Sequence, residues 1–371
     1  MGFVEELQAL DRSLPKTFKH CAIPTQLSRR ALLVVVRMNM PFVSVIILNH
    51  DGRDYLKPCL SSVLNSTYDE FEVILADNDS VDGSIEYVRH HFSQAVKLKV
   101  VALNKNYGFA VGNNMGYQKV DPKSKYVIFL NNDTQVERDW MQEIIKKMEN
   151  DPLIGAAQPK IRLMSDRNKI DAAGCTIDYY GRPFRLGNGE TDQGQYDSIS
   201  EIFFALGAAI ALRKEVIEKV GLFDSSFFAY YEETDLCWRI WLVGYKVVLV
   251  PKAIVYHWGG ATAKRKASMD ASVALKYRVF YRRRNQLIMM LKNYSLSNII
   301  KYVLPFGARI PVVALIRFAK GQSAEGLAYL DAIWSVLTSL SEITKKREHV
   351  QKTIRKLPDS EVMKLMISPV G

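Results

Sequence analysis

The stretch that decides the fold is Tyr126-Val127-Ile128-Phe129-Leu130-Asn131-Asn132-Asp133, an apolar run that stops abruptly in polar residues. Its first five residues are typical of a buried β-strand. Such a strand delivers the polar residues that follow it to the carboxyl edge of a sheet, where open α/β folds bind ligands. The carboxylate of Asp133 is therefore a candidate ligand for a hard divalent cation, and the structural alternative is a cap for a helix starting near Trp140.

The order of elements from Pro41 onward predicts an α/β domain with a mostly parallel sheet, because strands separated by helices imply crossover connections. Irregular glycine-rich sequence is expected between residues 156 and 207, where an insertion that shapes the substrate site would lie. The expected strands are 43–48, 71–75, 98–102, 126–130, 203–212 and 246–250. The expected helices are 55–64, 85–92, 112–118, 140–148, 214–220 and 236–243.

Three regions are expected along the chain. Residues 1–40 have weak periodicity and predict an N-terminal extension, and residues 41–263 hold the α/β domain. Residues 264–371 predict a basic, amphipathic helical region, which either packs on the domain or contacts a membrane. Its clearest apolar stripe at helical spacing is Leu327, Leu330, Trp334, Leu337 and Leu340.

Positive charge is concentrated in this last region. From Lys264 onward the chain has 20 basic and 7 acidic residues. The net charge of this region, +13, exceeds the net charge of the whole chain, +11. The basic residues are interleaved with apolar ones and match no nucleic-acid-binding module, so we expect a membrane surface as partner and no nucleic acid. We expect no membrane-spanning helix and no secretory signal. With four scattered cysteines typical of a reducing compartment, these features predict a cytoplasmic protein, peripheral on the inner face of the membrane.

A second carboxylate, that of Asp77, follows the apolar strand-like run 73–76. At the same sheet edge as Asp133, it could accept hydrogen bonds from a nucleotide base or from ribose hydroxyls. The local density of Asn, Asp and Ser leaves a plain turn as the alternative. No GxGxxG follows the first strand and no GxxxxGK[ST] occurs, which disfavours a nicotinamide enzyme and a P-loop ATPase.

Paired carboxylates follow about a hundred residues later, in Glu232-Glu233-Thr234-Asp235, and His257 comes after them. Aromatic residues at 227–231 directly precede the acidic segment, which favours a sugar platform beside a general base. The alternative is a solvated helix start, where acidic residues are favoured by the helix dipole. Together with Asp133, this set predicts a metal site that faces a base.

Several motifs in this order resemble those of family 2 glycosyltransferases with the GT-A fold, closest to the rhamnosyltransferase-like branch. The resemblance covers residues 41–263. The motifs are VSVIILNHDG at 43–52, ADNDSVDGS at 76–84, NYGFA at 106–110, LNNDT at 130–134, GLFD at 221–224, EETD at 232–235 and YHWGG at 256–260. The implied fold is a Rossmann-like, nucleotide-sugar-binding α/β domain.

The resemblance implies an inverting enzyme that transfers a sugar, with rhamnose as one candidate, from a dTDP- or UDP-linked donor to a glycan or lipid-linked acceptor in cell-surface polysaccharide synthesis. It places Asp133 and His257 on a divalent metal, Mg²⁺ or Mn²⁺. It makes Glu233 the general base, with Glu232 and Asp235 as alternatives. The implied nucleotide-sugar-binding residues are Asn49, Asp51, Asp77, Asn78, Gly108, Asn114, Asn131 and Asn132.

Two positions depart from the pattern of the family. Asn131 occupies the first acidic position of the Asp-x-Asp motif, and Glu233 stands where the family has Asp. These departures leave open a catalytically degenerate protein that only binds a nucleotide sugar or a membrane surface. A sugar-phosphate nucleotidyltransferase is disfavoured, because the segment 49–53 after the first strand is not the glycine-rich basic loop that such an enzyme needs.

Overall fold

The computed structural model describes residues 40–259 and 271–368. The chain divides into two units, Met1–Pro41 and Phe42–Gly371. Apart from Met40, the predicted N-terminal extension lies outside the described residues, as does the basic cluster at 264–266.

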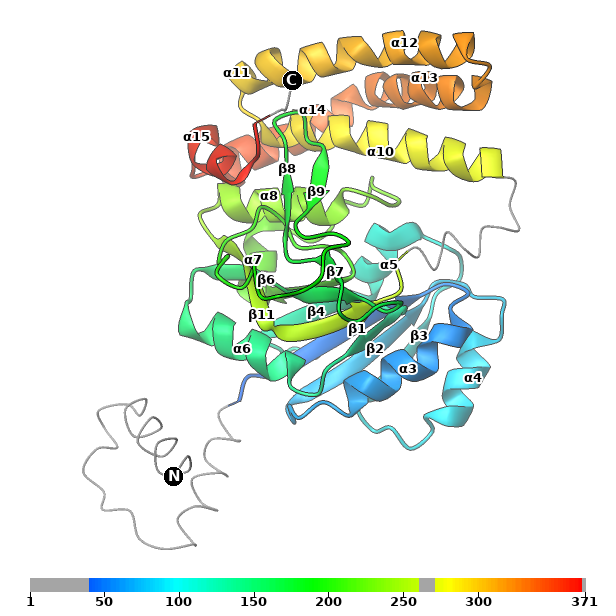
Figure 1. Cartoon of the computed structure of the whole chain (residues 1–371), viewed down its shortest axis with the longest axis vertical. Helices are drawn as coiled ribbons and strands as arrows, with labels where there is room; N and C mark the ends of the chain where they lie inside the picture. The colour runs from blue at the N-terminus through cyan, green and yellow to red at the C-terminus, as the bar shows by residue number, and fades with distance from the viewer. Residues whose placement is uncertain (1–39, 260–270, 369–371) are drawn as a thin grey trace, which may run out of the picture. The chain divides into compact units, whose positions relative to one another are not determined.

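A nine-stranded sheet forms the centre of the second unit (Figure 1). The strands β1, β2, β3 and β4 are parallel to one another, as predicted, whereas β10 is antiparallel to both of its neighbours. The sheet is therefore mixed, with a parallel half that ends in the polar residues singled out above. The strand order is β3 (Leu98–Ala102), β2 (Phe71–Asp77), β1 (Val43–Asn49), β4 (Tyr126–Asn131), β10 (Ala209–Arg213), β6 (Ile154–Leu163), β11 (Lys246–His257) and β5 (Thr134–Val136), and β7 (Ile170–Ala172) pairs with β6.

The helices between these strands match the predicted ones to within a few residues. Each turns an apolar face inward; in α6, for example, Trp140, Ile144 and Met148 are fully buried. Burial of side chains of this size is the main source of stability in such layered folds. The helices are α3 (Arg53–Leu64), α4 (Ser84–His91), α5 (Gly108–Tyr117), α6 (Trp140–Asn150), α7 (Lys214–Val220) and α8 (Glu232–Leu242).

The region expected to be irregular, 156–207, was predicted incorrectly in part. It contains most of β6, a ten-residue strand in the middle of the sheet, and a separate hairpin of β8 (Cys175–Ile177) and β9 (Pro183–Arg185). Three other boundaries also differ. The strand predicted at 203–212 begins only at Ala209, β11 runs on to His257, and α8 begins at Glu232.

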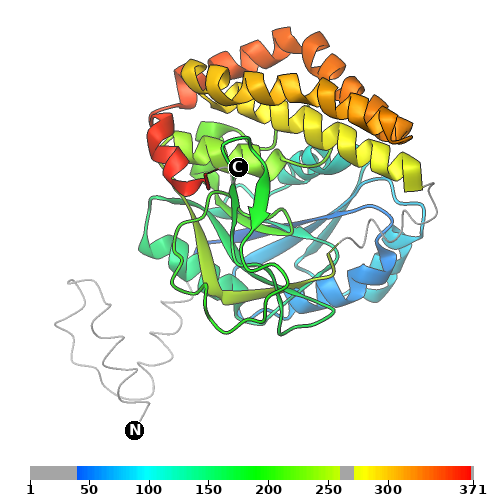
Figure 2. The same cartoon turned by 45° about the horizontal axis from the view of Figure 1, so that its top comes forward.

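The C-terminal helices pack on one another and on the α/β domain. The helix α10 lies between α8 and the outer pair α12 and α13 (Figures 1 and 2). Two backbone hydrogen bonds fasten the end of the chain to the domain, Lys356 N–H to Leu242 O at 2.7 Å and Ile367 N–H to Ile177 O at 3.0 Å. The helices are α10 (Ala271–Asn293), α11 (Leu296–Asn298), α12 (Leu304–Ala319), α13 (Ser323–Thr338), α14 (Leu340–His349) and α15 (Asp359–Val362), with a π-helical turn at Ile299–Val303.

The predicted apolar stripe on α13 faces outward. Trp334 is 69% exposed, and its four leucine companions in the stripe are exposed as well. The neighbouring run Leu296–Ala319 is long and apolar enough to cross a membrane by length and composition alone, with 22% of its most apolar window buried. The sequence analysis expected no segment of this kind, because Lys301, Pro305, Arg309 and Pro311 interrupt the run. By length and composition, Leu296–Ala319 nevertheless meets the requirement for a membrane-spanning helix.

Candidate active site

The first part of the site lies at the carboxyl ends of β1 and β2, where Asn49 and Asp77 are register partners. The Nδ2 of Asn49 donates to Asp77 Oδ2 at 2.8 Å, and Asn132 Nδ2 donates to Asn49 Oδ1 at 2.6 Å. The other carboxylate oxygen of Asp77 accepts the N–H of Ser80 at 2.9 Å. Asp51 joins the same loop, since its Oδ1 accepts the Val81 N–H at 2.8 Å. The structure thus brings these predicted donor-binding residues together, with Asp77 and Asn49 fully buried.

A second group of predicted donor residues holds the start of α5. Asn78 Oδ1 accepts the Tyr107 N–H at 2.9 Å, while its Nδ2 donates to Gly108 O at 3.2 Å. Asn114, on α5, donates from Nδ2 to Phe223 O at 2.8 Å. Asn131 is half-buried and accepts the Thr134 hydroxyl through its carbonyl at 2.7 Å. These contacts are structural, and they fix the loops that border the sheet edge.

The candidate metal site arises from strand pairing. The short strand β5 is antiparallel to β11 with His257 opposite Thr134, which places Asp133 next to the histidine. The distance from His257 Nε2 to Asp133 Oδ1 is 3.4 Å, and both residues are 6% exposed. On its other side, His257 Nδ1 lies 2.8 Å from Oδ2 of Asp171 on β7. Asp171 was missed by the sequence analysis, because it lies in the region expected to be irregular and belongs to no motif.

Opposing effects set the charge of this cluster. Burial disfavours the imidazolium, but hydrogen bonds and charges of Asp133 and Asp171 outweigh it and raise the pKa of His257 to about 9. Burial also works against ionisation of Asp171, yet His257 and Arg185 lower the pKa of that carboxyl below its ordinary value. The cluster is therefore a chain of alternating charges in a buried setting.

The residues present fit a divalent cation with few protein ligands. A carboxylate that accepts a hydrogen bond from Nδ1 of a histidine fixes the ring, and a cation would bind Nε2 in place of its proton. Within residues 40–259 and 271–368, no group of three or more His, Cys, Asp or Glu side chains is arranged to hold a metal by itself. The protein would therefore supply Asp133 Oδ1 and His257 Nε2, and oxygen atoms of a diphosphate and water would complete the coordination.

The candidate base lies at the start of α8. Burial raises the pKa of Glu232, and the charge of Glu233 raises it further. Burial also raises the pKa of Glu233. In each residue Oε2 is buried and has no hydrogen-bond partner in the described part of the chain. Buried polar atoms almost always have a hydrogen-bond partner. Unpaired carboxylate oxygens on two consecutive residues therefore indicate a site where a bound molecule donates a hydrogen bond.

Arg185, on β9, connects the base to the metal site. Its Nη1 lies 2.5 Å from Asp171 Oδ1, and its charge lowers the pKa of Glu233. One guanidinium thus acts on the carboxylate that holds His257 and on the candidate base. Arg185 was also missed by the sequence analysis, because only the fold brings its partner Asp171 to it.

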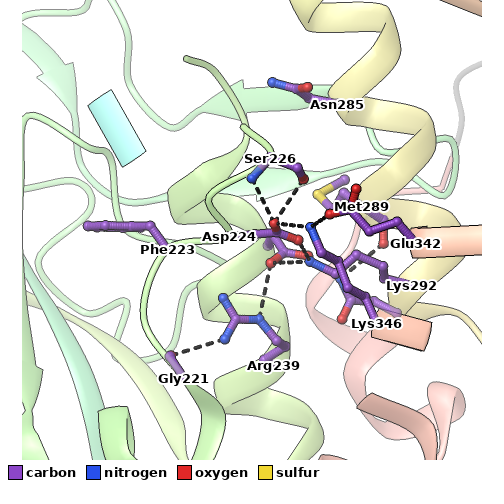
Figure 3. A network of polar contacts seen from close by, with 12 residues as sticks. Gly221, Phe223, Asp224, Ser226, Arg239, Asn285, Met289, Lys292, Glu342 and Lys346 are labelled. Carbon is purple, nitrogen blue, oxygen red and sulfur yellow. Dashed lines mark hydrogen bonds and ion pairs between the residues drawn. The ribbon is translucent and has the colours of Figure 1, made fainter. Parts of the chain in front are cut away.

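Asp235 has different surroundings from the two glutamates, because it pairs with Arg239 and Lys292, two cations of the network that Figure 3 shows around Asp224. Its Oδ2 accepts from Arg239 Nε at 3.0 Å and from Lys292 Nζ at 3.0 Å, and its Oδ1 accepts from Asn293 at 2.8 Å. Lys292 also pairs with Asp224. The Oδ1 of Asp224 in turn accepts a hydrogen bond from Nζ of Lys346, on α14, at 2.7 Å. This buried network ties α8 to the C-terminal helices and occupies both oxygens of Asp235.

The loop before α8 is strained and held from two sides. Tyr230 and Tyr231 have φ angles of 72° and 73°, a region that non-glycine residues rarely adopt. Asn285, on α10, donates from Nδ2 to Ala229 O at 2.8 Å and to Tyr230 O at 2.9 Å. On the opposite side, a side chain at Gly108 would come within 2.5 Å of Phe228. The C-terminal helices therefore help to place the first turn of α8.

The sheet and its polar edge define the GT-A class of α/β domain. Residues 44–221, just under half of the chain, match the family model described as Glycosyl transferase family 2. A similar fold occurs in a crystal structure of GalNAc-T7 with UDP, GalNAc and Mn²⁺, with a TM-score of 0.60 and 18% identity, covering 88% of this chain and 56% of that one.

Two curated relatives extend the comparison. The chain is 27% identical over 248 residues to the O-antigen biosynthesis protein RfbC of Myxococcus xanthus, covering 65% of this chain and 19% of that protein. It is 25% identical over 216 residues to the poly-beta-1,6-N-acetyl-D-glucosamine synthase of Staphylococcus aureus, covering 58% of this chain and 49% of that one. The chain thus spans less than half the length of either relative.

Proposed function

We propose that the protein is an inverting, metal-dependent glycosyltransferase that moves a sugar from a nucleotide diphosphate donor to a glycan or lipid-linked acceptor. The observation that carries the proposal is the pair of buried, unpartnered carboxylate oxygens on Glu232 and Glu233, connected through Arg185 to the Asp133 and His257 pair. The hydroxyl of an acceptor would donate a hydrogen bond to the unpaired Oε2 of Glu233. A pure structural role for these glutamates would leave their burial without compensation.

In this mechanism Glu233 accepts the proton of the acceptor hydroxyl as the hydroxyl oxygen forms a bond to the anomeric carbon of the donor sugar. The bond from that carbon to the diphosphate oxygen breaks, and the nucleoside diphosphate leaves with the electron pair. The raised pKa of Glu233 suits a proton acceptor near neutral pH. Glu232 is the alternative base, whereas both oxygens of Asp235 are already engaged in its ion-pair network.

The donor would lie along the carboxyl edge of β1, β2 and β4. Asp77 would bind the nucleotide base of the donor, and the loops held by Asn49, Asp51 and Asn78 would border the nucleoside. A cation on Asp133 and His257 would stabilise the negative charge of the leaving diphosphate. Imidazole in the ligand set favours Mn²⁺ over Mg²⁺. Asp171 would keep the His257 ring oriented toward that cation.

The relatives support a class of product for the proposed enzyme. RfbC is named for O-antigen biosynthesis and the synthase for poly-beta-1,6-N-acetyl-D-glucosamine, which supports a role in O-antigen or other polysaccharide synthesis. A dTDP- or UDP-linked donor, with rhamnose as the first sugar to test, is the finer proposal. The exposed apolar helices and the basic C-terminal region support a position on the inner face of the cell membrane.

The proposal is tested with the full-length protein, a panel of nucleotide sugars and either Mn²⁺, Mg²⁺ or EDTA. The expected result is release of a nucleoside diphosphate from one donor, dependent on the metal and lost in Asp133→Ala. Asp139→Ala is the matched control, because it removes an exposed carboxylate six residues further on. Nucleotide binding without turnover of any donor would instead favour a degenerate binding protein.

A further inference from the structure

A pocket of about 160 Å³ lies between the C-terminal helices and the loop that follows β8. Its arginines come from three elements: Arg182 from the loop before β9, Arg283 from α10 and Arg309 from α12. The rest of the lining is aromatic or aliphatic and includes no carboxylate. The remaining lining residues are Tyr180, Phe306, Ile310, Val313 and Tyr329.

Two of the three arginines keep their charge free for a ligand. Arg182 pairs with Asp178 at 2.5 Å. Arg283 donates to the neutral amide of Gln286 at 2.9 Å and lies over the Tyr329 ring, and no described carboxylate pairs with it. Arg309 has neither an ion pair nor a side-chain hydrogen bond to the described residues and is exposed. Guanidinium groups with no carboxylate partner among the described residues, as in Arg283 and Arg309, favour phosphate recognition.

An apolar surface continues from this pocket along α12. Phe306, Ile310 and Val313 line the pocket from one face of the helix. Beside them, Leu315 is 67% exposed and Val312 is 55% exposed, a strongly apolar surface for a helix of a domain in water. A ligand with an anionic head and a long hydrocarbon tail matches both the charge and the apolar surface.

The pocket and the proposed base share a neighbour, Tyr231. Tyr231, the residue before Glu232, is buried, and the charges of Arg283 and of Glu233 both act on its hydroxyl. On the same helix as Arg283, two residues further on, Asn285 holds the loop that leads into α8. A sugar attached to a head group in the pocket would therefore lie near the acidic residues.

We propose that this pocket, formed by Arg182, Arg283 and Arg309, binds the diphosphate of a polyprenyl-diphosphate-linked acceptor, whose tail lies along α12. The proposal rests on the proposed glycosyltransferase function and names the class of its acceptor. It gives the C-terminal helices a role in substrate binding besides packing. It also accounts for an arginine at 309 within the otherwise uncharged segment 304–316.

The test is vesicle flotation of the full-length protein at physiological salt, without donor or turnover. One set of phosphatidylcholine vesicles contains polyprenyl diphosphate, and a second set contains phosphatidylglycerol at equal surface charge. Arg309→Gln is the probe because the side chain is exposed and has no side-chain partner among the described residues, so we expect the fold to stay intact. Lys320→Gln removes an exposed charge just after the end of the same helix and is the matched control.

We expect Arg309→Gln to weaken binding to polyprenyl diphosphate vesicles about ten-fold, the size of one charge-assisted hydrogen bond, while the control stays close to wild type. Binding to phosphatidylglycerol should be weaker and should respond equally to both variants. Equal losses on both lipids, no loss at all, or inorganic pyrophosphate binding as tightly as the lipid would overturn the proposal. Because flotation needs no catalysis, failure here differs from failure of the donor assay.

Discussion

Asn285→Asp tests whether α10 positions the candidate base. The substitution keeps the size and shape of the side chain but replaces the Nδ2 donor by a charged oxygen, which then faces the carbonyls of Ala229 and Tyr230. Two hydrogen bonds worth about 1 kcal/mol each are lost. The positive φ angles of Tyr230 and Tyr231 store strain of about 1–3 kcal/mol each, so the released loop would relax.

A loss of about 2 kcal/mol lowers the population of the ordered loop, and with it kcat for transfer, roughly 30-fold. Donor affinity should stay within about two-fold, because Asn285 contacts the loop and not the donor edge. The assay is steady-state transfer with a calorimetric measurement of donor binding. Asn150→Asp, an exposed change of equal charge at the end of α6, is the control. A folded Asn285→Asp enzyme with wild-type kcat would refute the reasoning.

Three further predictions address the cluster around the site. Asp171→Asn weakens the acceptor that orients His257, the proposed metal ligand, so Mn²⁺ affinity by calorimetry should fall about 10- to 100-fold; unchanged affinity would separate Asp171 from the metal. The raised pKa values of Glu232 and Glu233 mean that the folded protein holds protons that the unfolded chain releases, so stability falls as pH rises above about 4.5. Glu232→Gln should therefore raise the melting temperature at pH 8 and not at pH 4, measured by scanning fluorimetry. Lys292→Met leaves Asp235 buried with one cation fewer and should cost about 3–5 kcal/mol in urea unfolding; a cost under about 1 kcal/mol would contradict the network's role.

The parallel half of the sheet could be predicted because its strands are buried on both faces. Buried parallel strands are continuous apolar runs, and each of β1, β2 and β4 ends in the polar residues that mark a ligand edge. Local sequence therefore indicates both the strand and the polar edge at which it ends. The same reasoning located Asp77 and Asp133 without any tertiary information.

The strand β6 was missed because its burial depends on distant partners. It contains Gln158 and Lys160, both almost fully buried, in place of the expected apolar residues. Lys160 is neutralised by Asp192 at 3.0 Å, and Gln158 accepts the Leu206 N–H at 2.8 Å. Such compensation joins residues more than thirty positions apart, which periodicity cannot reveal.

The candidate site was predicted as a set of residues but not as an arrangement. Sequence placed Glu232, Glu233 and Asp235 together, and only the fold separates the unpaired glutamates from an aspartate held by Arg239 and Lys292. Asp171, which contacts His257, lies on β7, and Arg185, which contacts Asp171, lies on β9. Both strands are three residues long and contain no recognisable motif. Pairing across the fold, not spacing along the chain, decides these roles.

The most direct test of the central claim is a single-turnover transfer assay that compares wild type with Glu233→Gln and Glu232→Gln at saturating donor and metal. We predict that Glu233→Gln lowers the transfer rate about 10²- to 10⁴-fold, the contribution of a general base, with donor binding retained, while Glu232→Gln keeps most of the rate. A Glu233→Gln enzyme that transfers sugar at the wild-type rate would contradict the assignment of the base and the mechanism built on it.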